Sequence, residues 1–147
     1  MPGFESTLGI VASKPMPLRV LVADDDRDTA NMLALLLRDE GHDVHTALRG
    51  DEVSEIDRLI RPDIVILDIN MPGMSGYAVA CELRERRGPL APLLIALSGS
   101  WKERADQRVA EQLGFDHYLL KPCEPARLLA LVNAFGRRAR GEASGGQ

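Results

Sequence analysis

The sequence has few of the residue types from which several kinds of site are built. Its two cysteines, Cys81 and Cys123, are too few for a disulfide framework or a cysteine-rich zinc site, and they fit a reducing compartment. Its six aromatic residues are too scattered to form a platform on which nucleic-acid bases stack. The net charge of −4 gives no general attraction to nucleic acid. These shortages indicate a cytoplasmic protein with no direct nucleic-acid partner.

Long apolar runs are also absent. No run approaches the roughly 20 residues that cross a bilayer, and the first 16 residues lack the basic end and apolar block of a secretion signal. We therefore expect no contact with a membrane. Since 45% of the residues are hydrophobic and 27% charged, the 147 residues fit one globular domain. The loose composition at both ends predicts flexible extensions over residues 1–17 and 138–147, flanking a domain over 18–137.

Short apolar runs alternate with stretches of helical period along this domain. The predicted strands lie at 18–23, 43–47, 63–67, 93–97 and 116–120. The predicted helices run from an N-cap at Asp28 or Thr29 to Glu40, over 51–60, from after Pro72-Gly73 to Gly88, over 103–113 and over 125–136. This alternation predicts an α/β fold, an open doubly wound sandwich around a parallel sheet. Helix 103–113 has only a thin apolar line, Ala105, Val109 and Leu113, which predicts weak packing.

Polar residues collect where four of the predicted strands end. They are the triplet Asp24-Asp25-Asp26, then Asp68, Ser98 and Lys121. Ligands bind at this edge of a doubly wound sheet. Each residue alone fits a turn, a helix cap or a loop, but clustered carboxylates repel one another unless a cation neutralises them. Carboxylate and carbonyl oxygens suit Mg²⁺, and a lysine and a hydroxyl opposite them would bind a phosphoryl group.

Four segments together resemble a known family. LRVLVADDD, DIVILDINMPGMSG, LIALSGS and DHYLLKP are similar to the CheY-like receiver domain of response regulators in two-component and phosphorelay signalling. The resemblance extends over residues 18–136. Its motifs follow in the family's order, with 43 residues from Asp25 to Asp68, 30 from there to Ser98 and 23 more to Lys121. It implies a (βα)5 sandwich with a five-stranded parallel sheet of order 2-1-3-4-5.

The resemblance also implies a role for each residue of the acidic cluster. Asp68 would accept a phosphoryl group from a histidine kinase or a histidine phosphotransfer protein, which makes an aspartyl phosphate. Asp25, Asp68 and the carbonyl group of Asn70 would bind Mg²⁺ directly, and Asp24 would bind it through water. Asp26 matches no ligand position. Lys121 would contact the phosphoryl group.

The same resemblance implies a conformational switch. Ser98 stands where the family has threonine or serine, and Tyr118 matches the aromatic residue that changes rotamer on activation. Residues 103–136 would then change their surface and control a downstream protein, with phosphorylation-dependent homodimerisation left open. The Lys121–Pro122 peptide bond would be cis.

Four other interpretations differ in class. The chain is either a stand-alone response regulator or a receiver domain taken from a hybrid histidine kinase. An aspartyl-phosphate phosphatase would need a second acid where Asn70 stands, so we expect no enzyme beyond the receiver's own phosphotransfer and dephosphorylation. A flavodoxin-like cofactor domain would have Ser, Thr and Gly where the acidic triplet stands. A degenerate receiver used only for protein contact conflicts with the full set of site residues.

Overall fold

Five parallel strands form the centre of the molecule in a computed structural model that describes residues 17–99, 104–139 and 141. The sheet order is β2-β1-β3-β4-β5, as the resemblance predicted. The strands are β1 (Arg19–Ala23), β2 (Asp43–Ala47), β3 (Ile64–Asp68), β4 (Leu93–Ser98) and β5 (His117–Leu120). The helices are α2 (Arg27–Asp39), α3 (Gly50–Ile60), α4 (Gly76–Arg87), the short η1 (Gly88–Leu90), α5 (Arg104–Gln112) and α6 (Pro125–Ala139).

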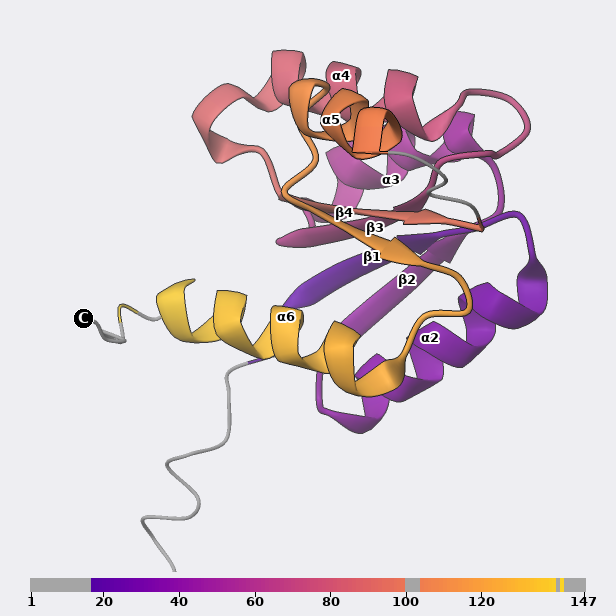
Figure 1. The fold of residues 1–147 in the computed structure, drawn as a ribbon. Helices are drawn as coiled ribbons and strands as arrows, with labels where there is room; N and C mark the ends of the chain where they lie inside the picture. Colours follow the sequence, from indigo (N-terminus) through magenta and orange to yellow (C-terminus); the bar gives the residue numbers. More distant parts are fainter. Residues whose placement is uncertain (1–16, 100–103, 140, 142–147) are drawn as a thin grey trace, which may run out of the picture.

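The helices cover both faces of the sheet, with α2 and α6 on one face and α3, α4 and α5 on the other (Figure 1). All five residues of β3 are buried, as an apolar central strand between two helical layers requires. Alternate strand residues therefore enter two separate core clusters. The first core cluster includes Val20 and Ile64 on one face of the sheet, and the second core cluster includes Leu21 and Val65 on the other. No helix among the described residues is long and apolar enough to cross a bilayer.

The register places the functional strand ends at one level. Ala23 of β1 pairs with Leu67 of β3, so the residues that follow them, Asp24 and Asp68, lie at the same level. Asp68 in turn pairs with Leu97, the residue before Ser98. The edge at which the sequence gathers its polar residues is therefore one continuous edge of the sheet.

The start of α2 differs from the prediction. The N-cap is Asp26, not Asp28 or Thr29. One oxygen of Asp26 accepts a hydrogen bond from the backbone N–H of Asp28 at 3.2 Å, and the other accepts from the Thr29 hydroxyl at 2.8 Å. The third acidic residue of the triplet thus begins the helix, and the first two remain for the site.

The apolar line predicted for α5 is wrong at its centre. Val109 is 43% exposed, whereas Ala110 beside it is buried against the second core cluster. Leu113 lies just beyond the helix and is half-buried, and the side chain of Ala105 lies outside the described residues. Among the described side chains of α5, only that of Ala110 is buried.

Candidate functional site

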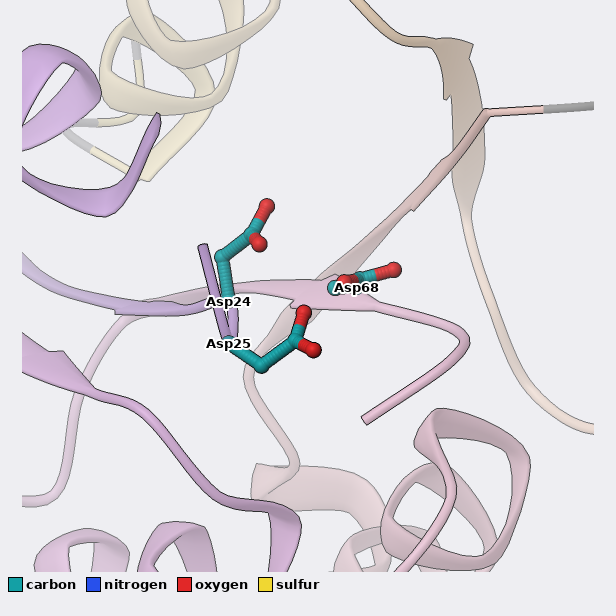
Figure 2. A group of neighbouring side chains, drawn as sticks. All are labelled: Asp24, Asp25 and Asp68. Atoms are coloured by element: carbon teal, nitrogen blue, oxygen red, sulfur yellow. The ribbon is translucent and has the colours of Figure 1, made fainter. Parts of the chain in front are cut away.

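Three carboxylates meet at the ends of β1 and β3. Asp24 and Asp25 follow β1, and Asp68 is the last residue of β3. One oxygen from each residue lies within 4.8 Å of the other two. Figure 2 shows the side chains at the neighbouring strand ends, with the Asp25 carboxylate extending toward Asp68. Asp24 and Asp68 are buried and Asp25 is exposed, so the cluster is open to solvent on the side of Asp25.

Lys121 supplies the positive charge of this site. It follows β5, and its backbone N–H donates to the carbonyl group of Ser98 at 2.8 Å. Its ammonium nitrogen lies 3.0 Å from Asp24 Oδ2 and 3.5 Å from Asp68 Oδ2. Burial alone would lower the pKa of Lys121, but the hydrogen bond with Asp24 and the charge of Asp68 outweigh it and raise the pKa. Lys121 is therefore a fixed cation between two buried carboxylates.

One cation does not fully compensate three carboxylates. Burial raises the pKa of Asp68 from 3.8 to about 6, and the charge of Asp24 and a hydrogen bond with Asp25 add to the rise. The backbone N–H of Asn70, which donates to Asp68 Oδ1 at 3.1 Å, and the charge of Lys121 act in the opposite direction. The balance still disfavours the ionised form of Asp68, so the site favours a further positive charge.

The donor set fits Mg²⁺. Every side chain in the cluster offers carboxylate oxygen, and no nitrogen or sulfur ligand takes part in it. Mg²⁺ prefers such oxygens, is held by one or two carboxylates and keeps several of its waters. The exposure of Asp25 leaves the cluster accessible to water.

The remaining residues proposed from the sequence lie along the same edge. Ser98 ends β4 and is buried, one strand away from Asp68. Tyr118 lies in β5 opposite Ala96 and packs against the second core cluster. It also lines a hollow of about 380 Å³ together with Gln107, Arg108 and Glu111 of α5. The Lys121–Pro122 peptide bond is cis.

No pattern in the sequence singled out Gly50, yet it lies against the loop that follows Asp68. It is the buried first residue of α3, and its N–H donates to the carbonyl group of Pro72 at 3.2 Å. A glycine at a helix start is not part of an apolar repeat, so the sequence gives no sign that Gly50 contacts this loop.

The structure is a doubly wound α/β domain whose ligand-binding edge carries an acidic cluster opposite a lysine. Residues 20–133 match the response regulator receiver domain, and the chain belongs to this family. Receiver domains are signalling proteins.

Individual proteins agree with the family. The DNA-binding response regulator MtrA of Mycobacterium tuberculosis is 39% identical over 125 residues, which are 84% of this chain and 52% of MtrA. The receiver domain of the Francisella response regulator 1452 superposes with a TM-score of 0.76 at 27% identity, covering 83% of this chain and 98% of that one. The chemotaxis response regulator CheY4 of Vibrio cholerae superposes with a TM-score of 0.75 at 26% identity, covering 82% of this chain and 99% of that one. The chain spans about half the length of the curated relatives it matches.

The raised pKa of Asp68 predicts a pH-dependent stability in the absence of metal. The native state binds this proton more tightly than the unfolded chain, so the contribution of Asp68 to stability is present below about pH 4 and is lost as the pH rises through about 6. In EDTA, the advantage of Asp68→Asn over wild type should therefore grow by about 1 kcal/mol between about pH 5 and about pH 7.5. Urea unfolding at each pH measures this difference.

Ser98→Ala is the matched control, because it changes the same edge and leaves all three carboxylates in place. Its stability should follow the wild-type pH profile. A difference between Asp68→Asn and wild type that stays constant with pH would contradict the assignment of the raised pKa to Asp68.

Proposed function

We propose that this chain is a phosphoacceptor switch in which Asp68 takes a phosphoryl group from a histidine kinase or a histidine phosphotransfer protein. The observation that carries the proposal is the position of Asp68. It ends the central strand within 4.8 Å of two other carboxylates and 3.5 Å from the Lys121 ammonium group. A buried carboxylate that has two further carboxylates and a lysine ammonium group beside it is arranged to receive a charged group.

The residues divide the chemistry of transfer among them. A carboxylate oxygen of Asp68 attacks the phosphorus atom, and the bond from phosphorus to the donor nitrogen breaks. Lys121 lessens the repulsion between the two anions and contacts the incoming oxygens. Asp25, Asp68 and the carbonyl group of Asn70 would hold Mg²⁺ directly, and Asp24 would hold it through water; the ion would supply further charge stabilisation of the phosphoryl group. A pKa of about 6 leaves Asp68 mostly ionised at neutral pH, as a nucleophile must be.

Ser98 and Tyr118 connect the site to a partner-binding surface in this proposal. The Ser98 hydroxyl would move to contact the phosphoryl group. Tyr118, which lies two residues before the pairing partner of Ser98 in β5, would turn inward. Tyr118 borders α5, which buries one side chain in its described part, so a movement of Tyr118 would change the face formed by α5, β5 and α6. That face would control a downstream protein or form a homodimer.

We further propose that residues 18–137 act as the receiver unit, in the cytoplasm. The relative MtrA is named a DNA-binding regulator and is about twice as long as the matched segment. If this sequence belongs to a longer protein of that kind, the expectation of no nucleic-acid partner applies to the receiver and does not extend to the whole protein. A stand-alone regulator and a receiver from a hybrid kinase remain the other two arrangements.

Incubation with acetyl phosphate and Mg²⁺ should label Asp68 and no other residue. Asp68→Asn should lose the label, because an amide oxygen is a poor nucleophile and cannot form a stable acyl phosphate. Peptide mapping by mass spectrometry checks the position. Asp26→Asn is the control, since Asp26 caps α2 and should leave labelling intact. Undiminished labelling of Asp68→Asn would contradict the proposal.

Beryllofluoride with Mg²⁺, which imitates the phosphoryl group, should change amide hydrogen exchange most in residues 104–120. Ser98→Ala should reduce this change while phosphorylation of Asp68 persists, because the contact that distinguishes the two states is lost. Thr46→Ala is the control. It removes a hydroxyl from β2, the outer strand on the side of the sheet away from β5, and should keep the wild-type response. Equal exchange in 104–120 with and without bound beryllofluoride would place the signalling surface elsewhere.

A further inference from the structure

We infer that Gly50 is a positioning residue for the proposed metal site, although it lies at the start of α3 and offers no ligand. The start of α3 presses against the loop 69–75, which connects Asp68 to α4 and carries Asn70. The inference rests on the proposed function, because it assigns to this contact the placement of the loop that carries a proposed Mg²⁺ ligand.

The contact between Gly50 and the loop is closer than any side chain allows. A Cβ atom on Gly50 would lie 1.8 Å from the carbonyl oxygen of Met74 and 2.7 Å from its carbonyl carbon. These atoms are backbone, so a larger residue would move the loop or the helix start. Gly50 is also buried, which closes the route by which a side chain could turn toward solvent.

A hydrogen bond couples the same two segments. The first N–H groups of a helix have no partner within the helix. The N-cap residue Arg49 makes no capping bond with its side chain, which instead donates to Asp51 at 3.0 Å. The N–H of Gly50 donates to the Pro72 carbonyl group, so the loop satisfies a donor at the start of α3.

Glycine is required on the loop side as well. Gly73 has a φ of +87°, a left-handed conformation that favours glycine. A Cβ there would lie 2.9 Å from the side chains of both Arg49 and Asp51, the neighbours of Gly50. The two segments therefore approach each other through glycines on both sides.

The loop is too short to absorb a displacement at its tip. Its inner end is held by two backbone bonds of 2.9 Å, from Ile69 N–H to the Leu97 carbonyl and from Gly76 N–H to the Ile69 carbonyl. A Cβ on Gly76 would lie 2.6 Å from the Asp68 carbonyl oxygen, so this end is also tightly packed. Movement at Met74 must be taken up between these fixed points, and Asn70 lies among the few residues available.

The first test compares the Mg²⁺ affinity of wild type and Gly50→Ala by calorimetric titration. Gly50→Ala should bind Mg²⁺ about tenfold more weakly while circular dichroism shows a folded protein. Gly136→Ala is the matched control, because its Cβ would meet only Leu18 Cδ1 at an ordinary 3.5 Å. Val132→Ala, in the core cluster on the other face, controls for a general loss of stability. Both controls should keep the wild-type affinity.

The second test needs no variant, because coupling between two sites is reciprocal. If the contact favours metal binding, Mg²⁺ must strengthen the contact, and exchange of the Gly50 amide hydrogen in the wild-type protein should slow. The amide of Leu93, bonded to Asp63 at the opposite end of the sheet, should exchange at an unchanged rate.

The outcomes distinguish a failure of this inference from a failure of the proposed phosphoacceptor function. Wild-type affinity in a folded Gly50→Ala, or unchanged Gly50 exchange with Mg²⁺ bound, would overturn the positioning role alone. A wild-type protein that binds no Mg²⁺ would overturn the proposed function together with this inference.

Discussion

Repulsion among three carboxylates at the ends of two adjacent strands is the constraint on which the rest of the structure depends. The parallel register of β1 and β3 brings Asp24 and Asp68 to the same level, and Asp25 follows within 4.8 Å. Lys121 compensates part of this charge, since its ammonium group lies between Asp24 and Asp68. Burial raises the pKa of Asp68 to about 6, and the charge of Asp24 and the hydrogen bond with Asp25 add to the rise. A site built in this way can hold a further cation.

The strand ends that carry the carboxylates are buried, whereas the described part of α5 is mostly not buried. β3 is buried throughout, and two core clusters fix the strand ends that carry the carboxylates. In contrast, α5 buries only Ala110 among its described side chains. Beyond its end, Arg84 of α4 donates to the Gly114 carbonyl at 2.9 Å and to Asp116 at 2.8 Å. Polar contacts thus fix the connection from α5 to β5, whereas Gln107–Gln112 of α5 contribute a single buried side chain.

Much of this arrangement could be predicted from the sequence, because strand ends and helix periods are local patterns. The five strands lie within a residue of their predicted positions, and the gathering of polar residues at one edge follows from a parallel sheet. The side of α5 that is buried could not be predicted, since Val109 is the larger apolar residue and Ala110 fits the closer approach. The burial of Asp57 in α3 was not predicted either, for a different reason. This residue has no exposed surface and accepts from Arg86 and Arg87 of α4 at 2.9 and 2.8 Å, so its burial depends on partners 29 and 30 residues away.

The central claim is that the acidic cluster is a metal site whose repulsion a divalent cation relieves. The melting temperature of wild type and Asp25→Asn, measured at rising MgCl2 and constant ionic strength, tests it most directly. The account predicts that millimolar Mg²⁺ raises the wild-type melting temperature by mass action. Asp25→Asn should melt higher without metal and respond less to it, whereas Asp39→Asn, exposed at the far end of α2, should respond as wild type does. An equal Mg²⁺ response in wild type and Asp25→Asn would contradict the account.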